Sequence, residues 1–242
     1  MAPSLALRCP LRCKQGEHTL EFHYAGKRVI RNVGAGNYFV PSYGWYPGDP
    51  RNSDAFATRA DFRLVFQHPK KFTLVATGEK ADETTDGKET TSTWKSAIPL
   101  AVAGFAFGDY NVTSQKVGDV NLEVYVNRSQ DDFLAFISRS FDSTLPTRTQ
   151  ENMEDMPEEP QQNMGPNAAV GGLNPAAMIK VMNNEIASTR RLFDSYFGPM
   201  PYDRLAVTNI PYTYGEGWPT LLYLSSLSFL DSTQRNALGI KD

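Results

Sequence analysis

Short segments in which apolar and polar residues alternate occupy the first half of the chain and constrain its fold more than any other feature. Such alternation is typical of strands with one buried face, and their β-branched and aromatic residues favour the same state. The segments cover residues 18–26, 61–67, 72–78, 89–95 and 121–126, with a polar hairpin tip at 79–88 and an apolar run at 100–110. The pattern predicts a mainly β first part, an antiparallel sheet or sandwich, and no long helix before about residue 130.

Helical spacing replaces this alternation in the second half. Residues 130–141 can form a helix, and a longer one is predicted after Asn174, a good N-cap residue followed by Pro175 at the first helical position. Its apolar stripe ends before Gly198, which is followed by proline. The stripe consists of Met178, Val181, Met182, Ile186, Leu192, Phe193 and Tyr196.

The end of the chain predicts only two more elements, strands at 204–210 and 220–226. One helix and two strands make an incomplete α+β unit, because such a small sheet needs further partners. We therefore expect a β domain over residues 1–127 and the start of an α+β domain over residues 128–242. Between them, residues 144–172 are polar, acidic and rich in Pro, Gly, Asn and Gln, which predicts a disordered insertion.

Charge and cysteine content exclude several classes of partner and site. The net charge of −3 offers no basic surface for nucleic acid, and no stretch has the apolar length of a transmembrane helix. Cys9 and Cys13 would lie roughly 13 Å apart in an extended segment, at about 3.3 Å per residue, which is too far for a disulfide. Two cysteines alone also make no structural zinc site.

The chain contains no complete catalytic constellation. His18 and His23 would point to opposite faces of a predicted strand, and neither they nor His68 fit the His-Glu-x-x-His spacing of a helical zinc site. No Gly-x-Ser-x-Gly nucleophile motif occurs. The sequence therefore predicts no catalytic residue and no metal ligand within this chain.

One segment, residues 213–220 (TYGEGWPT), stands out as a candidate binding site. It places Tyr214, Gly215, Glu216, Gly217 and Trp218 immediately before an apolar strand. Glycines there allow another backbone to approach closely, and a carboxylate at such an edge can receive a cationic amine. The alternative is a tight turn in which Glu216 is solvated and Trp218 covers the core. The residues alone leave both readings open.

Taken in order, several stretches resemble the M1 family of zinc aminopeptidases. The resemblance runs along nearly the whole chain outside residues 144–172. The ordered set carries it: residues 42–49 (SYGWYPGD), 60–66 (ADFRLVF), 75–78 (VATG), 103–110 (AGFAFGDY), 196–202 (YFGPMPY), 214–219 (YGEGWP) and 221–225 (LLYLS).

The resemblance implies a β domain followed by a thermolysin-like catalytic domain. In the family, a His-Glu-x-x-His helix and a further glutamate hold zinc, which polarises the peptide carbonyl and activates a water. That helix begins shortly after the segment matched here by Tyr214 to Pro219, so we expect this chain to be an internal fragment without the zinc ligands. The implied partner is a peptide substrate, and zinc is implied only for the full-length protein.

The candidate loop departs from the family's Gly-Ala-Met-Glu-Asn form. Aligned on Pro219 and Leu221, Gly217 takes the place of the amine-binding glutamate, Trp218 takes that of the asparagine, and Glu216 lies one residue early. A shift of one residue on a strand moves a side chain to the opposite face. The strand edge itself can still pair with an extended peptide.

Two functional hypotheses follow. The first is a fragment of a zinc metallopeptidase that hydrolyses peptides from the N-terminus, with residues 214–218 lining the substrate cleft and with no activity in the chain itself. The second is a non-catalytic M1-like peptide-binding or scaffold protein, which the altered loop favours.

Overall fold

The computed structural model describes residues 16–26, 29–34, 36–40, 45–47, 58–137 and 175–240, and most of their regular structure is β. The predicted insertion at 144–172, both cysteines and Asn174 lie outside these residues. Within them, no helix is long and apolar enough to cross a membrane.

The strand predicted at residues 18–26 is wrong, since these residues adopt no regular secondary structure. Leu20 and Tyr24 are exposed. Alternation alone does not make a strand, because the backbone also needs a neighbouring strand to satisfy its hydrogen bonds.

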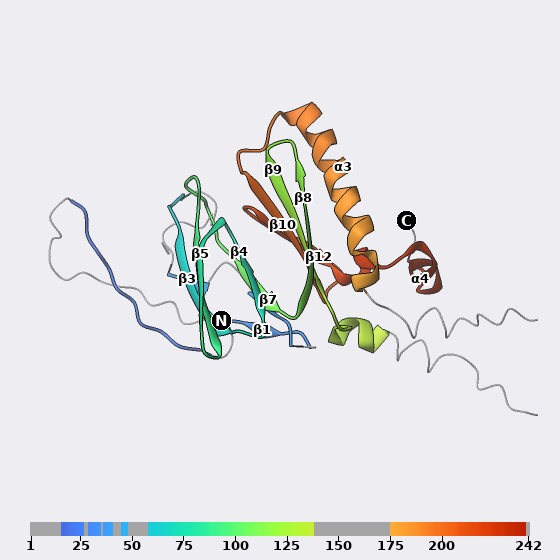
Figure 1. Cartoon of the computed structure of the whole chain (residues 1–242), viewed down its shortest axis with the longest axis horizontal. Coiled ribbons are helices and arrows are strands. Elements are labelled where there is room, and N and C mark those ends of the chain that lie inside the picture. The colour runs from blue at the N-terminus through green and yellow to red at the C-terminus, as the bar shows by residue number, and fades with distance from the viewer. Residues whose placement is uncertain are drawn as a thin grey trace, which may run out of the picture.

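Two antiparallel sheets form the first half of the fold (Figure 1). One has the order β1-β2-β7-β4 and the other β3-β6-β5. Their strands are β1 (Arg31–Asn32), β2 (Tyr38–Phe39), β3 (Arg63–Pro69), β4 (Thr73–Ala76), β5 (Glu79–Asp86), β6 (Glu89–Lys95) and β7 (Phe105–Gly108). The predictions for 61–67, 72–78 and 89–95 therefore correspond to β3, β4 and β6.

The polar segment at 79–88, predicted as a hairpin tip, is mostly a strand. Residues Glu79–Asp86 form β5, which pairs with β6 along its length, and Gly87 with positive φ makes the turn. All eight residues of β5 are exposed, so no apolar face marks it in the sequence. Charged side chains on an exposed edge strand oppose further strand addition.

A five-stranded mixed sheet forms the second half, in the order β11-β12-β10-β9-β8. Its strands are β8 (Tyr110–Val117), β9 (Val120–Asn127), β10 (Arg204–Ile210), β11 (Glu216–Trp218) and β12 (Leu221–Ser225). β10 runs parallel to both β9 and β12. Residue 127, the expected domain boundary, is the last residue of β9, so the sheet takes strands from both sides of it. The sheets divide at Asp109, between β7 and β8.

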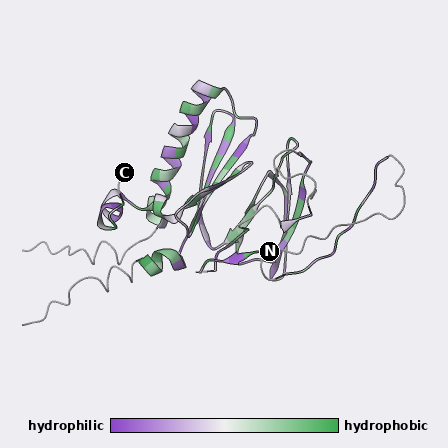
Figure 2. Ribbon diagram, turned by 180° about the vertical axis from the view of Figure 1, so that it is seen from behind, coloured by the Kyte–Doolittle hydropathy of each residue, from purple (hydrophilic) through white to green (hydrophobic). Residues whose placement is uncertain are grey.

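The longest described helix, α3 (Ile179–Phe197), covers the outer face of the five-stranded sheet. A 3-10 turn, η3 (Pro175–Met178), leads into it, and residues 132–137 are also helical. η4 (Ser226–Phe229) and α4 (Ser232–Ala237) follow β12. Figure 2 shows both hydrophobic and hydrophilic residues along α3. Met182 of the predicted stripe is buried, but Val181, Leu192, Phe193 and Tyr196 are exposed, so the stripe as a whole does not form a buried face.

Two cores result, one on each face of the five-stranded sheet. Met182 and Ala187 of α3 pack on the outer face with Val124, Leu122 and Val207. The inner face shares a larger core with the first two sheets, which includes Phe39, Val75, Trp94, Phe105, Ala206, Trp218 and Tyr223. This shared core presses the β11–β12 hairpin against the first two sheets.

Candidate functional site

The candidate loop forms the outer edge of the five-stranded sheet. Among the described residues β11 pairs with β12 alone, with Glu216 opposite Tyr223, Gly217 opposite Leu222 and Trp218 opposite Leu221. Pro219 and Thr220 make the two-residue connection. Trp218 and Leu221 flank this short loop as its hydrogen-bonded pair, and the pairing type then alternates. The backbone N–H and C=O of Gly217 therefore point away from β12, towards an incoming strand.

The turn of this hairpin is strained. Thr220 has a φ of 63° and is the one non-glycine residue with positive φ among the described residues. Pro followed by a positive-φ residue is the pattern of a type II turn, where glycine normally takes the second place. A non-glycine residue held there costs about 1–3 kcal/mol. The Thr220 hydroxyl accepts a 2.7 Å hydrogen bond from the Gly78 N–H, which ties the hairpin to the first half of the fold.

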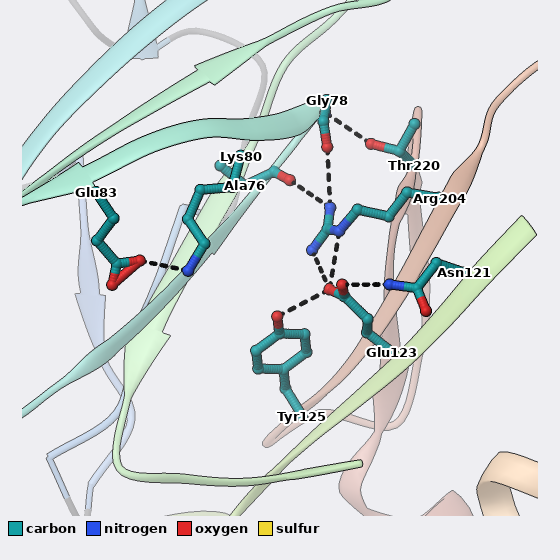
Figure 3. Close-up of polar contacts among 9 residues, drawn as sticks. All are labelled: Ala76, Gly78, Lys80, Glu83, Asn121, Glu123, Tyr125, Arg204 and Thr220. Carbon is teal, nitrogen blue, oxygen red and sulfur yellow. Dashed lines mark hydrogen bonds and ion pairs between the residues drawn. The ribbon is translucent and has the colours of Figure 1, made fainter. Parts of the chain in front are cut away.

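Gly78 is also the contact point of a buried arginine (Figure 3). The Nη1 group of Arg204 donates to the carbonyl oxygens of Ala76 at 3.1 Å and Gly78 at 3.0 Å. Arg204 Nε and Nη2 lie 2.8 and 2.7 Å from Glu123 Oε2. The two side chains are only 7% and 17% exposed. β9, β10 and the end of β4 are thus joined by one charged network directly beneath the hairpin.

Further groups complete this network. Tyr125 Oη donates to Glu123 Oε2 and Asn121 Nδ2 donates to Glu123 Oε1, each at 2.8 Å. The Arg204 guanidinium also lies 4.9 Å from the centre of the Trp94 ring. Because its charge is paired and hydrogen-bonded on several sides, the arginine is stable in a buried position.

Trp218 is part of the core between the halves. Its side chain is 2% exposed and lies edge-on to Tyr223, with ring centres 6.2 Å apart. A Cβ at Gly104 would come within 2.5 Å of Trp218 Cδ2, so only glycine leaves room for the indole. Tyr223 in turn donates a 2.8 Å hydrogen bond to the carbonyl of Phe105.

Glu216 is half-buried on the same face of β11 as Trp218, because residues two apart on a strand share a face. Its Oε2 atom is buried and has no hydrogen-bond partner among the described residues. Burial raises the pKa of the Glu216 carboxyl above its ordinary value of 4.5. A buried carboxylate oxygen of this kind is stabilised by any cation or donor that reaches it.

Tyr214, which lies near Glu216, belongs to a small cluster with Tyr212 and Arg31. The rings of Tyr212 and Tyr214 stack with centres 5.1 Å apart, and Arg31 Nη1 donates a 2.6 Å hydrogen bond to Tyr212 Oη. Burial raises the pKa of the Tyr214 phenol, and the nearby Tyr212 and Glu216 add to the effect. Tyr214 is still about half exposed, so its ring borders the edge from the solvent side.

The two glycines have different surroundings. A Cβ at Gly215 would lie 2.9 Å from the Tyr223 carbonyl oxygen, so this position needs glycine for close packing. Gly217 is exposed, and a Cβ there would meet only Leu222 Cδ2, at 3.7 Å. Position 217 is thus open on one face of β11, and the carboxylate of Glu216 lies on the opposite face.

The described residues bring together no group of three or more His, Cys, Asp or Glu side chains that could hold a metal ion. His18 and His23 are exposed, and His23 Nε2 lies 2.9 Å from Glu21. His68 is largely buried, and its Nδ1 lies 3.2 Å from the Pro69 carbonyl oxygen. This part of the chain does not fit a zinc site.

Comparison with known proteins finds a similarity to solved structures of M1 zinc metallopeptidases. No protein-family model and no curated protein sequence matches the chain. Among solved structures, it is similar to a mutant of a two-domain M1 zinc metallopeptidase bound to L-arginine, with a TM-score of 0.51, 18% identity and 86% of this chain covered. A mutant M1 zinc metallopeptidase from Deinococcus radiodurans, bound to a Tyr-Ser-Ala substrate, gives a TM-score of 0.50 with 18% identity over 84% of the chain.

The similarity is one of fold. The chain spans 40% and 39% of the lengths of these two structures. It shares the architecture of the corresponding part of M1 zinc metallopeptidases.

Several residues around the site had no signal in the sequence. Arg31 and Tyr212 are 181 positions apart and meet only through the packing of the two halves. Thr220 follows proline in a position that type II turns usually give to glycine, and this mismatch is the one sequence clue to its strain. Arg204 begins a predicted strand, but nothing in its neighbours indicates that it is buried.

Proposed function

We propose that this chain forms the peptide-binding edge of a zinc-dependent metallopeptidase that acts at the N-terminus of peptides. On this proposal the first two sheets belong to an N-terminal β domain. The five-stranded sheet begins a thermolysin-like catalytic domain, with the division at Asp109. The zinc ligands and the general base come from residues of a longer protein, and the chain alone neither binds zinc tightly nor hydrolyses peptides.

The observation that carries the proposal is Glu216 beside a strand edge that no other described strand pairs with. The outward N–H and C=O of Gly217 can pair with an extended peptide backbone. A peptide N-terminus is cationic at neutral pH, since its pKa is about 7.7–8.0. It would give the buried Glu216 Oε2 the partner that it lacks. Three further residues complete the site. The ring of Tyr214 borders the edge, Gly215 admits the backbone, and Trp218 fixes the hairpin.

Peptide binding to the chain tests this directly. A labelled peptide with a free amine and its N-acetylated twin are titrated against wild-type protein, Glu216→Gln and the control Glu185→Gln, which alters an exposed carboxylate on α3. One charged hydrogen bond of about 1.5–3 kcal/mol predicts a preference for the free amine of roughly ten- to a hundred-fold. Glu216→Gln should remove the preference but leave binding of the acetylated peptide, and Glu185→Gln should change neither.

Two results count against the proposal. Binding of neither peptide would rule out the strand edge as a binding site. Equal binding of both peptides to the wild type would rule out Glu216 as an amine anchor and leave only backbone pairing.

The glycine at position 217 favours a second candidate function, a non-catalytic peptide-binding or scaffold protein of the same fold. Experiments on the protein encoded by the complete reading frame distinguish the two functions. Stoichiometric zinc and chelator-sensitive hydrolysis of an aminoacyl substrate support the peptidase, and peptide binding without either supports the scaffold.

A further inference from the structure

A small cavity lies beside the β11 edge, next to the site described above. Its volume is about 290 Å³. Leu100, Val102 and Trp218 line it with apolar surface, and Gly217 borders it from the strand edge. At the lower end of ligand-pocket sizes, about 300–1,000 Å³, it suits a single side chain better than a cofactor.

The charge beside this cavity is positive. Arg59 is the one charged residue among the described residues that line it, and Tyr202 adds a phenol. Arg59 is exposed, but its backbone is held in place, because the neighbouring Ala60 exchanges two 2.9 Å hydrogen bonds with Leu100. The cavity therefore combines apolar walls with a cationic group beside them, a composition that complements a carboxylate on an aliphatic stem.

The geometry of strand pairing connects this cavity to a bound peptide. A strand added along β11 bonds through Gly217, and its side chains alternate between the two faces of the sheet. The side chain opposite Trp218 lies on the same face as Trp218. That face packs towards Val102, in the core shared with the first two sheets, so this one side chain is directed at the cavity.

We propose that the cavity receives a carboxylate-bearing side chain of a peptide paired with β11, with Arg59 as its counter-ion. The inference rests on the proposed function, since it requires a peptide at that edge. It adds a preference for acidic peptides, set by a residue of the first half of the fold.

The test uses the full chain and labelled hexapeptides of Ala and Thr that carry Glu at one position, each compared with its Gln twin. We expect that Glu binds up to about fivefold more tightly than Gln at the position that enters the cavity, the effect of one ion pair with an exposed arginine. Arg59→Gln should abolish the difference and leave the affinity for the Gln peptide unchanged. Arg59→Glu should reverse it in favour of a Lys peptide. Because Arg59 is exposed, neither substitution should alter folding, which circular dichroism checks.

Arg191→Gln is the matched control, because it removes an exposed positive charge from α3. The preference should survive in this variant. If Arg191→Gln weakens it as much as Arg59→Gln does, long-range attraction explains the effect and the cavity assignment is wrong. Equal binding of Glu and Gln peptides at every position overturns this inference alone, whereas failure of all peptides to bind overturns the proposed function with it.

Discussion

Replacing Glu123 by Gln tests whether the charged network beneath the hairpin holds the two halves of the fold together. The substitution keeps the shape of the side chain and removes its charge, so Arg204 stays buried beside Ala76 and Gly78 without a counter-ion. Glu123 accepts from Asn121 and Tyr125 as well as from Arg204, so all three contacts weaken together.

Burial sets the expected magnitude. With side chains 7% and 17% exposed, Arg204 and Glu123 belong to the class of buried pairs. Removing one partner of such a pair typically costs 3–5 kcal/mol, because the other charge remains desolvated and unpaired. A domain of ordinary stability unfolds with about 5–15 kcal/mol, so Glu123→Gln should lower the urea midpoint markedly.

The neighbouring Lys80–Glu83 pair provides an internal control (Figure 3). Its side chains are 46% and 41% exposed, and pairs of that kind contribute about 0–1 kcal/mol. Lys80→Gln should therefore leave the midpoint almost unchanged. Equally small decreases in the free energy of unfolding for Glu123→Gln and Lys80→Gln would refute the reasoning. Burial would then make no difference to the contribution of an ion pair to stability.

Three further predictions concern the hairpin. Thr220→Val should lower the free energy of unfolding by about 1–3 kcal/mol, because the Gly78 N–H loses its acceptor and the backbone strain remains. Thr220→Gly relieves that strain and should lower the free energy of unfolding by less. A urea denaturation in which Thr220→Gly is less stable than Thr220→Val would contradict the strained turn. Gly104→Ala should destabilise by about 1–3 kcal/mol and shift tryptophan fluorescence, because its Cβ would displace Trp218; an unchanged spectrum would exclude the contact. Burial raises the pKa of Glu216 above 4.5, so the folded state binds the proton more tightly than the unfolded state. The free energy of unfolding of the wild type should therefore fall, relative to that of Glu216→Gln, as pH rises through the raised pKa. Free-amine binding should rise over the same interval because it needs the ionised carboxylate, and parallel pH profiles of wild type and variant would argue against both effects.

The sequence alone was sufficient for elements with a buried face on a regular period. β6 and β10 occupy the predicted residues 89–95 and 204–210. In these segments local propensity and burial favour the same structure, so periodicity is informative. β5 shows the limit, because an exposed edge strand buries neither face and leaves no such pattern.

The grouping of strands into sheets was decided by the tertiary structure. β9 pairs with β10 across some eighty residues of chain, because parallel strands join through long connections that no local pattern reveals. The same holds for the candidate site. The residues of the loop are evident in the sequence, but the half-burial of Glu216 and the open edge at Gly217 depend on the sheet in which β11 lies. Burial and charge pairing arise from contacts between distant segments, and these exist only in the folded chain.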